Sequence, residues 1–290
     1  MSIKESATLV VGGTGFIGKA LVERLQNDQK NILYTSRRNS LDPRFIPLSS
    51  ISNWRDLVQD RNINQIYIVA GKYQSSDNPL FWGDLWEANY TFPKQILDQL
   101  WDLDLRILLV GSFLQKNPAA KELWSFYTWS KECLRHYINL KAAESRAQIT
   151  YVYLYDNFGP NDERLKILNI LMKLSESDQP LKCGSSEQDL DLTHISDVTA
   201  GLILANNLSR KENPCEFQIR GIKPISLKNL VKLVEEYRKM KIPVLFGENI
   251  DRRPIFNLWN CAKEIPGFNC QITLEEFLSG NFETVRKQMS

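Results

Sequence analysis

Short apolar runs alternate with stretches of helical periodicity along the first half of the chain. The runs predict strands at residues 8–11, 31–35, 65–70, 106–110 and 148–155. Residues 16–27, 85–100 and 123–140 repeat apolar positions at the helical period, and the second of these stretches carries Pro93. Strands that alternate with helices predict right-handed βαβ units and a parallel sheet.

The second half of the chain mixes shorter elements. Its pattern predicts helices at residues 165–174, 227–240 and 274–289, strands at 216–219 and 242–246, and a strand-to-helix passage at 191–204. No linker rich in glycine and serine divides the chain. We therefore expect an α/β fold, with a Rossmann-type doubly wound parallel sheet and a smaller, interwoven substrate-binding part. The expected bounds are 1–158 plus about 190–222 for the Rossmann domain, and about 159–189 and 223–290 for the other part.

A glycine-rich turn follows the first predicted strand. Gly12, Gly15 and Gly18 stand three residues apart in the stretch GGTGFIG, and a predicted helix begins within it. The first glycine permits a tight turn, the second lets the backbone approach a pyrophosphate, and the third allows close helix packing. An ordinary turn is the alternative, but the place between strand and helix favours a dinucleotide site. The expected contacts are Gly12, Thr14, Gly15, Phe16 and Ile17.

The second predicted strand leads into Ser36, Arg37 and Arg38. Units that bind NAD usually place an Asp or Glu about 20 residues after the glycines, where it holds the ribose hydroxyls. No acid stands here. Ser36 could donate a hydrogen bond to a 2′-phosphate, and either arginine could pair with it. This position favours NADP(H), against the alternative that the arginines simply lie in a solvated loop.

Tyr127 and Lys131 stand four residues apart on a predicted helix, so that their side chains share a face. A free tyrosine has a pKa near ~10, and a nearby ammonium lowers it. Such a pair is a general acid–base that needs no histidine. Ser112 follows the preceding strand, where ligands bind in such sheets, and could hydrogen-bond the oxygen that Tyr127 protonates. An ordinary loop serine is the alternative there.

Composition narrows the function further. The 290 residues include 36 Lys and Arg against 34 Asp and Glu, and a net charge of +2 argues against a nucleic-acid partner. No apolar run approaches the ~18 residues that a membrane span needs. His136 and His194 are the only histidines, so no metal site is expected. Five scattered cysteines and a start without the shape of a signal peptide indicate a cytoplasmic protein.

Together these features resemble the extended short-chain dehydrogenase/reductase family, and within it the NAD-dependent epimerase/dehydratase branch. Five segments are similar to motifs of that family: GGTGFIG at 12–18, IYIVAG at 66–71, YTWSK at 127–131, NFGPND at 157–162 and DLTHISDV at 191–198. The most similar subgroup is that of CDP-abequose synthases and related NDP-4-keto-6-deoxyhexose reductases. The resemblance covers essentially the whole chain.

The resemblance implies NADPH-dependent reduction of the C4 ketone of a nucleotide-linked 4-keto-6-deoxy sugar, for deoxysugar and polysaccharide biosynthesis such as that of lipopolysaccharide O-antigen. By the resemblance, Tyr127 is the proton donor, Lys131 holds the nicotinamide ribose and Ser112 aligns the carbonyl. The further contacts that it implies are Ala70 and Gly71 for the cofactor, and Ser112, Asp156, Asn157 and Arg253 for the nucleotide-diphosphate sugar. It also implies a homodimer formed through the helix of Tyr127.

Some positions depart from the family pattern. Tyr153 and Leu190 stand where the family often has arginine, and Asp156 stands where it often has asparagine. A carboxylate at 156 would repel a sugar diphosphate unless a base offsets its charge. Phe113 and Leu114 occupy the place of the Asp-Glu pair of dehydratases, which argues against a 4,6-dehydratase. Two alternatives remain open, namely a 4-epimerase with bound NAD and a non-catalytic NADP-binding regulator.

Overall fold

The computed structural model describes residues 6–28, 31–74, 78–116, 125–208, 212–247 and 258–280. The chain folds into two compact units. The first unit takes in the described residues of 1–154, 199–218 and 261–266, and the second takes in those of 155–198, 219–260 and 267–290. Each unit is therefore built from segments that lie far apart in the sequence.

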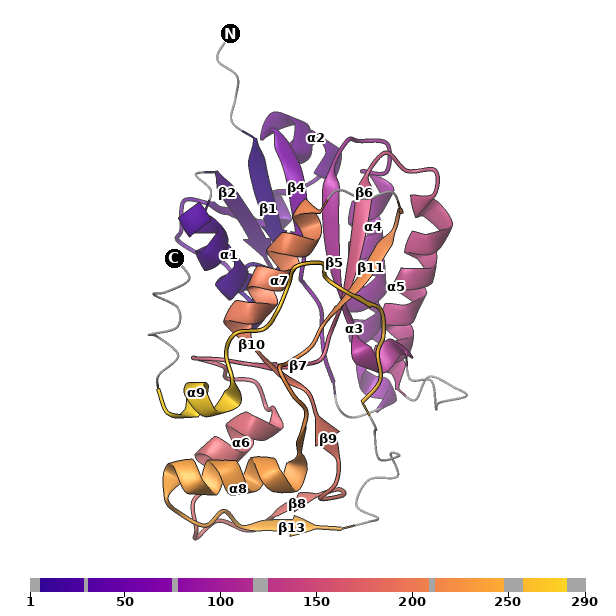
Figure 1. Ribbon diagram of the computed structural model, residues 1–290. Coiled ribbons are helices and arrows are strands. Elements are labelled where there is room, and N and C mark those ends of the chain that lie inside the picture. Colours follow the sequence, from indigo (N-terminus) through magenta and orange to yellow (C-terminus); the bar gives the residue numbers. More distant parts are fainter. Residues whose placement is uncertain are drawn as a thin grey trace. The chain divides into compact units, whose positions relative to one another are not determined.

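An eight-stranded sheet forms the centre of the first unit (Figure 1). Its order is β14-β11-β6-β5-β4-β1-β2-β3. Each pair of neighbours in the row β6-β5-β4-β1-β2-β3 runs parallel, and so does the pair of β11 and β14. The strands are β1 (Ala7–Val11), β2 (Ile32–Ser36), β3 (Phe45–Pro47), β4 (Ile63–Ile68), β5 (Arg106–Ser112), β6 (Gln148–Leu154), β11 (Cys215–Ile219) and β14 (Lys263–Glu264). The chain runs outward from β1 to β3 and then returns to β4 on the other side of β1. Ligands of such sheets bind at this reversal, beyond the carboxyl ends of the strands.

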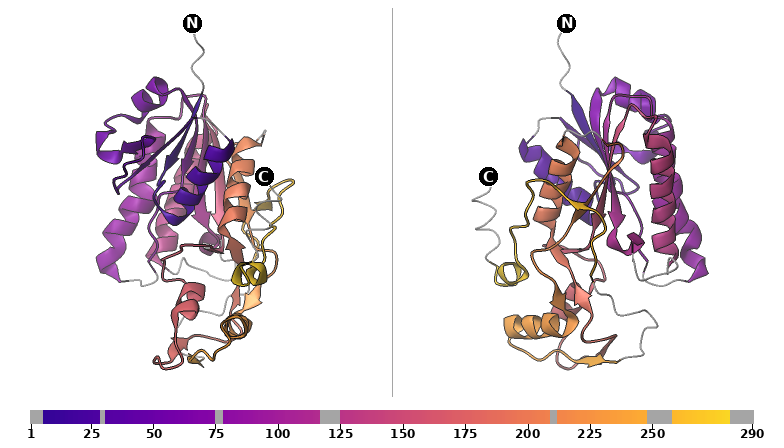
Figure 2. Two further views of the ribbon diagram at one scale, coloured as in Figure 1. Left: turned by 90° about the vertical axis from the view of Figure 1, so that its left-hand side faces the viewer. Right: turned by 45° about the vertical axis from the view of Figure 1, so that its right-hand side comes forward.

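Helices cover both faces of this sheet (Figures 1 and 2). One face carries α1 (Phe16–Asp28) and the part of α7 (Ile195–Asn207) that belongs to this unit, and the other carries α2 (Trp54–Asp60), α4 (Phe92–Asp98) and α5 (Phe126–Ala142). All five residues of β1 are buried, as are the last three of β4. Strands covered on both faces are apolar throughout, which explains the short apolar runs of the sequence. The predicted Rossmann-type α/β fold is confirmed.

The helix predicted at residues 85–100 is interrupted. α3 (Trp82–Trp86) leads into a π-helical turn at Glu87–Thr91, and α4 follows. Pro93 lacks the N–H that would bond to the carbonyl of Asn89 in a regular α-helix, so the ladder is broken there. Turns of this type are frequent at functional sites. Here the turn contains Asn89, which is buried.

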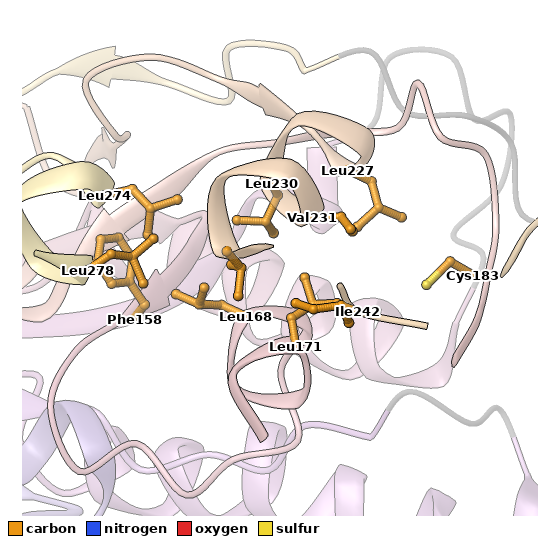
Figure 3. Packing of buried hydrophobic residues seen from close by; sticks show 11 residues of the cluster. Phe158, Leu168, Leu171, Cys183, Leu227, Leu230, Val231, Ile242, Leu274 and Leu278 are labelled. Atoms are coloured by element: carbon orange, nitrogen blue, oxygen red, sulfur yellow. The ribbon is translucent and has the colours of Figure 1, made fainter. Parts of the chain in front are cut away.

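The second unit has its own hydrophobic core (Figure 3). Helices α6 (Ile167–Lys173), α8 (Leu227–Arg238) and α9 (Leu274–Leu278) supply much of it. Its buried members are Phe158, Leu168, Leu171, Cys183, Leu227, Leu230, Val231, Val234, Ile242, Leu274 and Leu278. The four members from α8 follow the i, i+3, i+4, i+7 spacing of one helix face, as the sequence pattern predicted.

Three small strand pairs complete the second unit. β7 (Asp156–Phe158) runs parallel to β10 (Leu192–His194), and β8 (Leu181–Cys183) runs parallel to β13 (Val244–Phe246). β9 (Asp189–Leu190) and β12 (Ile225–Ser226) are antiparallel. In the part of the chain that the structure describes, no helix combines the length and the apolar character that crossing a membrane requires.

Candidate active site

The glycine-rich turn joins β1 to α1 next to the reversal of the sheet. The N–H groups of Gly12 and Gly13 both donate to the carbonyl of Thr35, at 2.8 and 3.1 Å. Gly12 has a φ of +97°, and a Cβ there would lie 2.6 Å from the backbone nitrogen of Ala70. A Cβ at Gly18 would lie 2.1 Å from the carbonyl oxygen of Gly12. The turn therefore packs too tightly against Ala70, which follows β4, and against the start of α1 to admit a side chain at either position.

Gly15 is in a different environment. A Cβ at this position would meet only the carbonyl oxygen of Gly12, at the ordinary distance of 3.4 Å, so its side of the turn is open. The turn leads directly into α1, whose first N–H groups have no partner within the helix and whose first turn carries no acid. Open backbone at the positive end of a helix fits a pyrophosphate group.

Ser36 links the turn to the end of β2. Its hydroxyl lies 2.5 Å from the hydroxyl of Thr14 and accepts from the N–H of Arg38 at 3.0 Å. Ser36 therefore holds the loop that carries Arg37 and Arg38, both of which are exposed. Two exposed guanidinium groups at the carboxyl end of β2 suit an anionic partner.

Asn89 holds the loop after β4 against α5. Its amide accepts from the N–H of Lys72 at 3.0 Å, donates to the carbonyl of Lys72 at 2.9 Å and donates to the hydroxyl of Ser130 at 3.2 Å. A Cβ at Gly71 would lie 3.2 Å from Asn89 Oδ1 and 3.7 Å from Lys131 Nζ. Gly71, a predicted cofactor contact, thus lies beside the amine of Lys131.

Tyr127 and Lys131 lie in the first half of α5, which Ser125 caps by accepting from the N–H of Thr128 at 3.2 Å. Each of the two residues is 9% exposed. Lys131 Nζ lies 5.9 Å from the centre of the Tyr127 ring and donates to the carbonyl of Val110 at 2.9 Å. The two side chains share one face of the helix, as the spacing predicted.

Burial lowers the pKa of Lys131 to about 8. This value is still above neutral, so the side chain carries a proton at pH 7. A poorly solvated ammonium interacts strongly with any negative charge that forms beside it. Lys131 can therefore stabilise the phenolate of Tyr127 without being lost as a cation.

Ser112 is the last residue of β5 and is buried. Its N–H donates to Gln115 Oε1 at 2.7 Å, and its hydroxyl accepts a long hydrogen bond of 3.4 Å from the N–H of Leu114. The same strand provides the carbonyl of Val110 that binds Lys131. The first unit thus brings the three predicted catalytic residues to the end of β5 and the start of α5, whereas Gln115 was not predicted.

Asp156 and Asn157 lie on β7 in the second unit. Lys166 Nζ donates to Asp156 Oδ1 at 2.8 Å, so a base offsets the carboxylate that the sequence placed at this position. Asn157 is buried, and among the described residues its Oδ1 has no hydrogen-bond partner. The sequence analysis did not predict Lys166, because a lysine that stands ten residues after its partner Asp156 gives no periodic signal. Arg253, the remaining predicted sugar-nucleotide contact, lies outside the described residues.

Comparison with known sequences places these residues in a wider context. The model of the NAD dependent epimerase/dehydratase family matches residues 8–219, well over half of the chain. CDP-abequose synthase from Yersinia pseudotuberculosis is 24% identical over 208 residues, which cover 67% of this chain and 71% of that protein. The range matched by the family model includes the glycine turn, Ser112, Tyr127 and Lys131.

Solved structures show the same fold. MoeE5 in complex with UDP-glucuronic acid and NAD has a TM-score of 0.77 at 20% identity, covering 98% of this chain and all of that one. UDP-glucuronic acid 4-epimerase from Bacillus cereus, in complex with UDP-glucuronic acid and NAD, has a TM-score of 0.80 at 17% identity. The likeness covers 97% of this chain and 99% of that one. At such low identities the likeness establishes the fold alone.

Proposed function

The chain belongs to the NAD dependent epimerase/dehydratase family, and on this premise we propose that it is an NADP(H)-dependent reductase. Its substrate is the C4 ketone of a nucleotide-linked 4-keto-6-deoxy sugar. The observation that carries the proposal is the buried Tyr127–Lys131 pair, whose lysine binds the carbonyl of Val110 on β5, the strand that ends at Ser112. The likeness to CDP-abequose synthase supports a nucleotide-sugar substrate, as do the UDP sugars bound to the two solved structures.

The residues of the first unit suit such a reduction. A bound nicotinamide cofactor would supply the hydride. Tyr127 donates its proton to the carbonyl oxygen as that oxygen gains negative charge, and the Lys131 ammonium stabilises the phenolate that remains. Ser112 donates a hydrogen bond to the same oxygen and orients the ketone. Tyr127 then recovers its proton from water.

We assign the cofactor to the first unit and the sugar nucleotide to the second. The glycine turn and α1 receive the pyrophosphate, while Gly71 and Lys131 border the nicotinamide ribose. Asp156 and Asn157, with Lys166 beside them, and Arg253 contact the sugar nucleotide. The unpartnered Oδ1 of Asn157 supports this assignment, because a buried acceptor gains from a ligand that can donate to it.

The proposal is tested by mixing the purified protein with NADPH and CDP-, dTDP-, UDP- and GDP-linked 4-keto-6-deoxy sugars. At least one of them should cause the near-ultraviolet absorbance of NADPH to fall, with a 4-hydroxy sugar as the product. If the absorbance of NADPH falls with none of the four substrates, the proposed reductase activity is refuted. NADPH binding without any sugar-nucleotide binding in calorimetry would indicate a non-catalytic regulator instead.

A 4-epimerase is the second candidate, because the two solved structures named above bind NAD. The same Tyr127–Lys131 pair suits epimerisation equally well, since that reaction needs an acid–base that removes the proton of the C4 hydroxyl and returns it, while bound NAD would take and return the hydride at C4. An epimerase would copurify with NAD and interconvert two sugars without net consumption of NADPH. Extraction of the purified protein followed by chromatography of the released nucleotide separates the two candidates.

The preference for NADP(H) predicts a specific effect at the end of β2. Replacing both Arg37 and Arg38 by alanine should weaken NADPH binding about 10- to 100-fold, because a charge-assisted hydrogen bond contributes about 1.5–3 kcal/mol. NADH binding should change little, and calorimetry with both cofactors measures the difference. Arg55→Ala is the control, since Arg55 pairs with Asp102 outside the site. An equal loss for both cofactors would show that the arginines do not distinguish them.

We also propose that the protein is a homodimer formed through α3 and α5. Trp82 and Trp129 are 39% and 43% exposed, although they stack on Phe126 and Trp86 at 4.8 and 5.1 Å. An ordered, exposed aromatic surface is typical of an interface. Trp129→Glu should therefore halve the mass measured by sedimentation, whereas Leu41→Glu, at a fully exposed position elsewhere, should not. A wild-type protein that sediments as a monomer would contradict the proposal.

A further inference from the structure

Gln115 stands three residues after Ser112, and its side chain connects three elements of the first unit. It lies in the short 3-10 turn that follows β5 and is only 4% exposed. Its Oε1 accepts from the N–H of Ser112 at 2.7 Å and from the hydroxyl of Tyr151 on β6 at 3.2 Å. Its Nε2 donates to Glu132 Oε2 on α5 at 3.1 Å. One buried amide thus joins the end of β5 to both β6 and α5.

The surroundings of Gln115 leave little freedom. A Cβ at Gly111 would lie 2.8 Å from Gln115 Oε1 and 2.4 Å from the ring of Tyr151, so only glycine fits there. Burial raises the pKa of Tyr151, which keeps its hydroxyl protonated as a donor. The oxygen of Gln115 therefore faces two donors that persist over the whole pH range of a folded protein.

The nitrogen side of Gln115 is equally fixed, because Glu132 belongs to an ionic cluster with Lys116, Arg135 and Glu216. Arg135 Nε donates to Glu132 Oε1 at 2.8 Å, and Arg135 Nη1 lies 3.2 Å from Glu216. Glu216 also binds Lys116 at 2.6 Å and the hydroxyl of Tyr153 at 2.9 Å. Burial would raise the pKa of Glu216, but the hydrogen bond from Lys116 and the other partners lower it overall, so the carboxylate stays ionised. The ionic cluster is a rigid anchor for Gln115.

We propose that Gln115 is a positioning residue that holds the hydroxyl of Ser112 in register with Tyr127 and Lys131. This inference rests on the proposed function. Glu132 directly follows Lys131 in α5, so two hydrogen bonds of one side chain connect the serine to the helix that carries the pair. A misplacement of about 1 Å at a reacting group costs roughly 10²-fold in rate. In the described part of the chain, the hydrogen bonds of the Gln115 side chain go to Ser112, Glu132 and Tyr151, which lie outside the glycine turn.

An exchange of side chains between positions 115 and 132 tests this role. Gln115→Glu places a carboxylate against Glu132, so the bond to α5 is lost, and kcat should fall roughly 10- to 100-fold. The affinity for NADPH should stay within about threefold of wild type. The double variant Gln115→Glu with Glu132→Gln has the same net charge as wild type. It restores a donor opposite an acceptor, so kcat should recover most of the loss.

Three results in solution would each overturn the proposal: an unchanged kcat in Gln115→Glu, a loss of NADPH affinity as large as the loss of kcat, or no recovery in the double variant. Gln115→Met, uncharged and of similar length, replaces the single variant if that one does not fold. Crystal structures of wild type and variant with NADPH form a second arm. They should show Ser112 displaced from Lys131 by about 1 Å, and an unmoved Ser112 also overturns the proposal. Because this arm needs no sugar substrate, it decides the role of Gln115 even if no member of the panel is reduced and the proposed function fails.

Discussion

A Tyr127→Phe variant is expected to reduce the sugar substrate about 10²- to 10⁴-fold more slowly than the wild type, the range that loss of a general acid costs. The substitution removes only the hydroxyl. The ring keeps its edge-on contact with Tyr73, at 5.0 Å between centroids, and its place beside Lys131. We therefore expect the affinity for NADPH and the free energy of unfolding to be nearly unchanged. The rate is measured as a single turnover of NADPH with saturating sugar nucleotide, and the affinity by calorimetry.

Tyr137→Phe is the matched control for this prediction, because it removes a hydroxyl from the same helix. That hydroxyl donates to Asp98 and lies outside the site, so the rate should not change. A Tyr127→Phe variant that kept more than about a tenth of the wild-type rate would show that another group donates the proton. A Tyr127→Phe variant that lost NADPH binding together with the rate would point to a role in holding the cofactor.

The central strands of the first unit could be predicted because burial on both faces leaves a strong local signal. The run predicted at 8–11 is β1 (Ala7–Val11), and the run predicted at 148–155 is β6 (Gln148–Leu154). β3 (Phe45–Pro47) was missed, since three residues that end in proline form no pattern. Helix α2 was missed as well, because its seven residues form only two turns and it begins at a cap on Asn53. Strand order was not readable, since it depends on which distant segments pair.

The same distinction applies to the site. The glycine turn spans seven residues and the Tyr127–Lys131 pair five, so each is a local pattern that can be read in the sequence. Their order along the chain, with the turn after the first strand and the pair on a later helix, made the prediction specific. Gln115 and Lys166 act through partners on other elements, and no periodicity marks such a pair. Function-bearing residues that work through tertiary hydrogen bonds therefore escape a reading of the sequence.

Replacing Lys131 by methionine is expected to change activity and stability in opposite directions. Without the ammonium, the phenolate of Tyr127 loses its stabilising charge, and we expect the rate of reduction to fall at least about 10²-fold. The unliganded protein should nevertheless become more stable at pH 7, because burial of the charged lysine costs the folded state free energy. The difference between a pKa of about 8 when folded and about 10.4 when unfolded corresponds to roughly 3 kcal/mol. Loss of the hydrogen bond to Val110 offsets about 1 kcal/mol of this gain.

The pH dependence separates this charge effect from simple repacking. Below about pH 8 the lysine is protonated in both states, and the folded protein bears the full burial cost. Between about pH 8 and 10.4 the folded state gives up its proton first, so the unfolded state binds more protons and the wild type gains stability as the pH rises. The stability advantage of Lys131→Met should therefore be largest near pH 7 and vanish toward pH 10, as urea unfolding at a series of pH values would show.

Lys141→Met is the control, because it changes an exposed lysine on the same helix, and it should give no such trend. An advantage that stayed constant with pH would mean that the methionine merely packs better. An advantage that disappears identifies the burial of Lys131 as a cost in stability that the fold retains for the sake of the reaction.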